Sequence, residues 1–179
     1  MISLNYTTNC THISKNLLEN LKKDNKNNDV IEENIDLPDE SNSTASEIDV
    51  SETILNPQWF KNTSVEELKK VITHIKDINI SNEKGITPLM YAVSYSNIEI
   101  VKYLIDNEAD VNSKNNMGNT VLMFACSYSS SPKIIDLLID NGADVNIKNS
   151  KDKTALDYIK NNAKLNQTNA IMRLELLTH

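Results

Sequence analysis

The sequence contains few of the residues on which catalytic loops and disulfide-linked folds depend. Its 179 residues include three Gly, two Cys, three His and 5% aromatic residues. With so few glycines, no Gly-rich loop that could cradle a phosphate is present. Cys10 lies in a polar segment and Cys126 in an apolar helical pattern, so we expect no disulfide between them and a reducing compartment. We also expect no cofactor.

Long hydrophobic runs and an excess of positive charge are also absent. No stretch approaches the roughly eighteen apolar residues of a membrane span. Residues 1–15 lack the basic start and the apolar run of a secretory signal. The net charge of −7 disfavours nucleic acids and anionic membranes as partners. We therefore expect a cytoplasmic, monomeric protein that binds neither, with export as an effector as the open alternative.

The acidity belongs to the first third of the chain. Residues 1–55 hold eleven Asp or Glu and four Lys, whereas residues 56–179 hold fourteen residues of each sign. The first segment has too little apolar surface to offset the entropy of ordering, so we expect residues 1–55 to be a disordered leader. Within it, residues 13–23 place four apolar residues on one helical face, namely Ile13, Leu17, Leu18 and Leu21. This stretch is either a helix that folds onto a partner or the domain, or a transient helix without a role.

After the leader, the chain repeats itself at an interval of 33 residues. The stretch "ITPLMYAVSYS" at 86–96 returns as "NTVLMFACSYS" at 119–129, and "DVN" at 110–112 returns at 144–146 with one residue inserted between. Self-similarity at such a period is typical of stacked repeats. Partial copies flank the two clear ones at residues 65–79 and 152–159.

Each unit has the pattern of two short helices. Thr87 followed by Pro88 predicts a helix start, with a capping hydroxyl and a proline where no N–H is needed. Ser64 and Glu67 have the spacing of a capping box. Gly142 stands where a left-handed residue ends a helix. One helix pair cannot bury its own apolar face, so the units are expected to stack side by side.

The pattern "G-x-T-P-L-x-x-A … I-V-x-x-L-I-x-x-x-A-D-V-N" is similar to the ankyrin repeat and covers about residues 60–178. The resemblance implies an all-α solenoid of stacked helix-turn-helix units with short β-hairpin-like turns. The stretch "WFKNTSVEELKKVI" also resembles the truncated first repeat of bacterial ankyrin proteins. As a small protein of about three to four repeats, the chain resembles bacterial or viral members of the family. The expected division is a leader at 1–55 and a repeat domain at 56–179, with an N-terminal capping repeat at about 56–81, units at 82–114 and 115–148, and a C-terminal capping repeat at 149–179.

The chain departs from the family pattern at several positions. Glu108 stands where the next unit has glycine, and a side chain in the left-handed conformation there would cost on the order of 1 kcal/mol. Asp152 replaces a turn glycine, a milder change because Asp tolerates positive φ. Ile159 stands where Ala92 and Ala125 sit in the other units, so the last unit is expected to pack differently.

The resemblance implies a non-enzymatic module that binds another protein on the concave face made by the first helices and the hairpin tips. Tyr95 and Tyr128 are the main candidates, because tyrosine supplies large amphipathic contact area; alternatively, they only cover the stack. Tyr91 and Phe124 are expected to pack in the core or between units. By the resemblance, the family's variable contact positions map onto Glu83, Lys84, Ile86, Ser94, Tyr95, Asn116, Met117, Asn119, Ser127, Tyr128, Ser150, Lys151 and Lys153, with Asn161 and Asn162 beyond them.

No set of residues in the sequence has the spacing of a catalytic or metal site, so we expect no enzyme. The histidines share no metal-binding spacing. Cys126 follows Ala125 inside a packed helical pattern and is expected to be a small buried hydrophobe rather than a nucleophile. The abundance of Asn, with seventeen Lys against one Arg, looks like an AT-rich coding sequence and carries no expectation for the fold.

A second functional hypothesis concerns the leader. A linear motif at residues 13–23 or 47–55 would carry the activity of an effector or adaptor, and the repeats would serve as its targeting scaffold. This hypothesis predicts that residues 1–55 alone bind a target or direct export.

Overall fold

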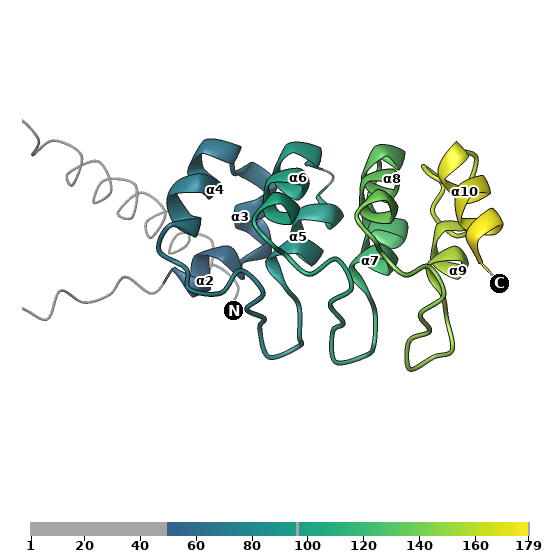
Figure 1. Ribbon diagram of the computed structural model, residues 1–179, viewed down its shortest axis with the longest axis horizontal. Coiled ribbons are helices and arrows are strands. Elements are labelled where there is room, and N and C mark those ends of the chain that lie inside the picture. Colours follow the sequence, from purple (N-terminus) through teal and green to yellow (C-terminus); the bar gives the residue numbers. More distant parts are fainter. Residues whose placement is uncertain (1–49, 96, 179) are drawn as a thin grey trace, which may run out of the picture. The chain divides into compact units, whose positions relative to one another are not determined.

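The computed structural model describes residues 50–95 and 97–178, all of which lie in one compact unit (Figure 1). These residues form helices, and the strand pairing found among them is one isolated bridge between Lys114 and Thr120. No helix in these residues is long and apolar enough to cross a membrane. The helices are α2 (Ser51–Ile54), α3 (Pro57–Asn62), α4 (Val65–Ile72), α5 (Pro88–Ser94), α6 (Ile98–Asp106), α7 (Val121–Tyr128), α8 (Pro132–Asp140), α9 (Ala155–Ile159) and α10 (Asn169–Leu177).

The folded part of the chain begins before residue 56, where the sequence analysis places the domain boundary. Val50 is 5% exposed and Ile54 is fully buried, and α2 packs against α3. Residues 50–55 are therefore an exception to the disorder expected for the leader. A single helical turn in a six-residue segment with three apolar residues leaves little periodic signal. The 13–23 segment and residues 47–49 of the 47–55 segment lie outside the described residues.

The helices begin where the sequence predicts. The Thr87 hydroxyl accepts the N–H of Met90 at 3.4 Å, and Pro88 is the first residue of α5. Ser64 and Glu67 form the predicted capping box, with bonds of 3.2 and 3.1 Å. Each cap supplies partners for N–H groups that the helix itself cannot satisfy. These local signals fix where α4 and α5 begin.

The helices lie in two rows, as Figure 1 shows. One row consists of α3, α5, α7 and α9, and the other consists of α4, α6, α8 and α10, with neighbours in each row in contact. The helices α5 and α6, and likewise α7 and α8, also contact each other across the rows. The expected stack of helix-turn-helix units is thus confirmed.

The core runs between the rows and from unit to unit. Ala92 and Ala125 are 1% and 0% exposed, and their small side chains let α5 and α7 approach closely. Leu104 and Leu138 from the other row are fully buried. Burying one such leucine stabilises the fold by about 1.5–3 kcal/mol. The burial depends on adjacent units, so no unit is expected to fold alone.

The last unit has a shorter first helix than the units before it, in line with the different packing predicted from Ile159. Ile159 is fully buried at the end of α9, which has five residues, whereas α7 has eight. A long loop follows before α10, and Leu165 in this loop is also fully buried. The last unit therefore combines a shorter first helix with a buried loop residue.

Among the residues that the structure describes, two non-glycine residues have left-handed backbone conformations, at the two positions predicted from the sequence. Glu108 has φ +67° and Asp152 has φ +57°. Gly142, which occupies in the next unit the position of Glu108, has φ +85°. A Cβ at Gly142 would meet no atom within 4 Å, so backbone strain is the main cost of a side chain at this position.

Glu108→Gly should therefore stabilise the protein by about 1 kcal/mol, because it relieves the strain of a side chain at positive φ. The matched change Gly142→Ala should destabilise it by a similar amount. Urea unfolding followed by circular dichroism measures both midpoints. A midpoint that Glu108→Gly leaves unchanged or lowers would contradict the strain argument.

Candidate functional site

Three hairpin loops precede α5, α7 and α9 and project from the same side of the stack (Figure 1). With these helices they form one continuous surface, which we call the hairpin face. It consists of residues 80–95, 113–128 and 147–160.

An asparagine closes each hairpin from within. Asn82 Oδ1 accepts the N–H groups of Lys84 and Ile86, both at 3.0 Å. Asn115 and Asn149 occupy the equivalent positions and accept the equivalent pairs of N–H groups at 2.9 to 3.0 Å. Asparagine suits this position because its side chain reaches backbone groups two and four residues ahead. The three hairpins therefore share one hydrogen-bond pattern.

Hydrogen bonds also join each hairpin to the next. The backbone N–H of Asn116 donates to the carbonyl of Lys84 at 3.1 Å, and its side-chain amide donates to the carbonyl of Glu83 at 2.8 Å. The backbone N–H and the hydroxyl of Ser150 donate to the carbonyl of Met117 at 3.0 and 2.9 Å. Successive hairpins are thus held in register, and the side chains at their tips have fixed neighbours.

We call α4, α6, α8 and α10 the outer helices. A second set of asparagines bonds each turn that follows an outer helix to the equivalent turn of the next unit. Asn79 Oδ1 accepts the N–H of Asp110 at 2.8 Å, and its Nδ2 donates to the carbonyl of Glu108 at 3.2 Å. Asn112 makes the same two bonds to the following unit, at 2.8 and 2.9 Å. Each unit is therefore fastened to the next by side-chain amides as well as by apolar packing.

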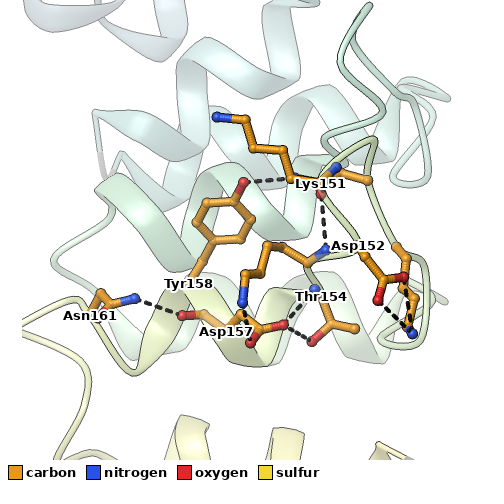
Figure 2. Close-up of polar contacts among 9 residues, drawn as sticks. Lys151, Asp152, Thr154, Asp157, Tyr158 and Asn161 are labelled. Atoms are coloured by element: carbon orange, nitrogen blue, oxygen red, sulfur yellow. Dashed lines mark hydrogen bonds and ion pairs between the residues drawn. The ribbon is translucent and has the colours of Figure 1, made fainter.

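A buried polar corner joins the second and third hairpins. Asn149 is 8% exposed, and its Nδ2 donates to the Tyr158 hydroxyl at 2.7 Å and to Asn119 Oδ1. The Tyr158 hydroxyl donates in turn to Asn119 Oδ1 at 3.2 Å. Figure 2 shows Tyr158 rising from α9 toward this hairpin. The corner satisfies each polar atom that it removes from water, as buried polar groups require.

The outer rim of the third hairpin carries ion pairs (Figure 2). Lys148 Nζ lies 3.1 Å from Asp152 Oδ1, and Lys153 Nζ lies 3.5 Å from Asp157 Oδ1. The backbone N–H of Thr154 donates to Asp157 at 2.9 Å and lowers the pKa of this carboxyl below its usual value. These pairs are exposed and contribute little to stability. Their effect is to neutralise part of the local charge.

Aromatic rings lie along α5 and α7 of the hairpin face. Tyr91 packs between units, as predicted: its ring stacks on Phe60 at 6.0 Å, and its hydroxyl accepts a bond from Asn82 at 2.9 Å. Burial raises the pKa of the Tyr91 hydroxyl, although the bond from Asn82 lowers it. Phe124 is half-buried, and its ring lies 5.9 Å from the ring of Tyr128 on the same helix.

Some of the predicted contact residues use their side chains inside the repeat domain. The hydroxyls of Ser94 and Ser127 donate to the carbonyls of Met90 and Met123 at 2.7 and 2.8 Å. Ile86 is 9% exposed and belongs to the interior. These three side chains offer little surface to a partner. Five more of the predicted residues take part in the hairpin interactions described above: Glu83, Asn116, Asn119, Ser150 and Lys153. The side-chain amide of Asn161 donates to the Asp157 carbonyl. The side-chain amide of Asn162 donates to the Cys126 and Ser129 carbonyls.

Other predicted residues face the solvent. Tyr128 is 64% exposed and Met117 is 47% exposed, two of the most exposed large apolar side chains in the described residues. Lys84 and Lys151 are also exposed at the tips of the hairpins, whereas Tyr95 is half-buried. The structure thus brings an aromatic ring, a thioether and two ammonium groups onto one hydrogen-bonded frame.

The described residues contain no group of three or more His, Cys, Asp and Glu that could hold a metal ion. Cys126 is fully buried in α7, and burial raises the pKa of its thiol to about 12. A neutral, enclosed thiol is a poor nucleophile.

The asparagines of the hairpins and turns are the residues that sequence reasoning missed. Nucleotide composition alone does not explain the abundance of Asn. Asn82, Asn115 and Asn149 recur at intervals of 33 and 34 residues, as do Asn79 and Asn112 with Asn146. This periodicity, shared with the core residues, is the signal that identifies them.

Asn149→Ala should destabilise the protein by about 2–3 kcal/mol, because it removes the acceptor of two backbone N–H groups, those of Lys151 and Lys153, and the amide that donates to the Tyr158 hydroxyl. The matched variant is Asn116→Ala, which removes one exposed side-chain bond and should cost less than about 1 kcal/mol. Chemical unfolding of both variants measures the difference. Equal losses would contradict a special role for the buried corner.

The Cys126 thiol should resist thiol reagents at pH 8 in the folded protein and react fully in urea. A Cys10→Ser background removes the other thiol. Because the folded pKa of Cys126 lies above the unfolded value, its contribution to stability is complete below pH 9 and is lost as pH rises toward 12. Rapid labelling of the native Cys10→Ser chain would show that α7 does not enclose the thiol.

Comparison with known proteins identifies the repeat. A family model described as ankyrin repeats in three copies matches residues 59–149, half of the chain. The search of curated proteins finds no match. Ankyrin repeats generally bind proteins and are typically non-catalytic, so the match suggests a protein-binding module. The chain belongs to the ankyrin repeat family.

Proposed function

We propose that this protein is a non-enzymatic binding module that holds a partner protein on its hairpin face. The observation that carries the proposal is the exposure of Tyr128 and Met117 on this face. Large apolar side chains of this kind are enriched at the energetic centres of protein interfaces. Both come from the middle unit, which has a neighbouring unit on each side.

The rigidity of the surface supports the same proposal. The ring of Tyr128 lies against Phe124, and the tip at Met117 is bonded to the next hairpin through Ser150. Groups that are already fixed lose less conformational entropy when a partner binds. The hairpin face therefore has the properties of a preorganised contact surface.

Exposed apolar residues also occur at the end of the stack. Met172 and Leu176 on α10 are 61% and 81% exposed. Neither belongs to the hairpin face, and nothing in the described residues indicates what would cover them. They provide a matched control, because they have similar chemistry at a different place.

The double variant Tyr95→Ala/Tyr128→Ala should keep its helical circular dichroism and lose capture of the partner, with affinity falling at least about tenfold if the rings are anchors. The measurement is affinity capture with the full-length chain, followed by titration of the protein that it retains. The control Met172→Ala/Leu176→Ala should capture the partner as well as the original chain. Unchanged capture by the tyrosine variant, or equal loss in both variants, would remove the hairpin face from the proposal.

A further inference from the structure

Charges are separated between the two faces of the repeat stack. The hairpin face has six lysines and three carboxylates. The outer helices and the turns after them, at residues 64–79, 97–112, 132–146 and 169–178, have six basic and eleven acidic residues. Residues 56–179 have a net charge of zero, but the hairpin face is positive and the outer helices with their turns are negative.

Ion pairing sharpens this difference. Two of the three carboxylates on the hairpin face, Asp152 and Asp157, pair with Lys148 and Lys153. Within residues 50–95 and 97–178, the other lysines of the face take part in no ion pair. The remaining charges on the face are four lysines against Glu83. These lysines are Lys84, Lys114, Lys151 and Lys160.

Two of these four lysines lie at the hairpin tips, in one row with Met117. Lys84, Met117 and Lys151 occupy one position in successive hairpins, because the N–H of each donates to the closing asparagine at 2.9 to 3.0 Å. All three side chains are exposed. Neighbouring units lie about 8–10 Å apart. Met117 is therefore flanked on both sides by an ammonium group, with roughly 16–20 Å between the two lysine positions.

We propose that the hairpin face binds an acidic polypeptide segment, with carboxylates paired to Lys84 and Lys151 on either side of an apolar side chain that packs on Met117. This inference rests on the proposed function and names the chemistry of the partner. An extended chain advances about 3.3 Å per residue, so acidic residues about five or six positions apart would reach both lysines.

The spacing of the charges favours a polypeptide over a nucleic acid. A nucleic-acid strand carries a phosphate about every 3.4 Å and is bound best by a continuous basic track. Here the tip row has a methionine between two lysines, and the outer helices are acidic. An acidic segment with one apolar residue matches this alternation, whereas a uniform polyanion does not.

The overall charge of −7 does not oppose such a partner. Exposed charges are screened within about 8 Å at physiological ionic strength, so the lysines at the tips determine the local field. Each exposed pair contributes about 0.2–1 kcal/mol. Binding should therefore weaken as salt is added, and the effect should appear largely in the association rate.

The test uses the full-length chain and a short fluorescent peptide with glutamates at both ends and one leucine in the middle, titrated by anisotropy. The variant Lys84→Glu/Lys151→Glu should bind about tenfold more weakly, because two attractive contacts become repulsive. The control Lys102→Glu/Lys133→Glu makes the same change of net charge on the outer helices and should alter affinity less than about twofold. Replacing the central leucine with serine should also weaken binding.

Three results would overturn the proposal. They are equal losses in the two lysine variants, equal binding of a peptide with lysines in place of its glutamates, and tighter, lysine-dependent binding of a single-stranded oligonucleotide. The failure of this inference can be told apart from failure of the proposed function. If the tyrosine variant loses the captured partner and Lys84→Glu/Lys151→Glu keeps it, only the acidic partner is wrong; if both keep it, the hairpin face is wrong.

Discussion

The inability of one helix pair to bury its own apolar residues governs this structure. Each of α5, α6, α7 and α8 has an apolar face that adjacent helices must cover. Stacking units side by side satisfies this need, and small residues such as Ala92 and Ala125 set how closely they approach. The repeat in the sequence is thus a repeated packing requirement.

The polar residues serve the same constraint at the edge of the stack. Hairpins and turns have little apolar surface, so packing alone would leave them loosely placed. Asn82 and its equivalents fix the shape of each hairpin, while Asn79 and Asn112 fasten one unit to the next. Because hydrogen bonds hold the hairpins, their outward side chains are free to vary. This division explains how one frame can present Tyr128 and Met117 to solvent without a loss of order.

Much of the fold could be predicted from the sequence, because its signals are local. The caps at Ser64 and Thr87 and the left-handed positions at Glu108 and Asp152 follow from residue type and register. Contacts between distant residues could not be predicted in this way. The pairing of Arg173 with Asp136 and Asp140, for example, depends on how α10 lies against α8 after a loop of unusual length.

The candidate site was predicted less completely than the fold. Resemblance to a family indicates which positions can face a partner, but not which side chains the neighbouring unit engages. Ile86 is predicted as a contact residue and is 9% exposed, and Asn119 Oδ1 accepts a bond from Tyr158 that the sequence does not reveal. The separation of charge also requires the structure, because it emerges only once segments 33 residues apart are known to share a face.

If each unit is stable only when its neighbours cover its apolar face, the units must unfold together. Native-state hydrogen exchange measures this by following the backbone amides of α5 to α8 as denaturant is added. We expect these amides to become exposed together, with one free energy and one dependence on denaturant. Separate exchange of α5 with α6 and of α7 with α8, each pair at its own free energy, would contradict it.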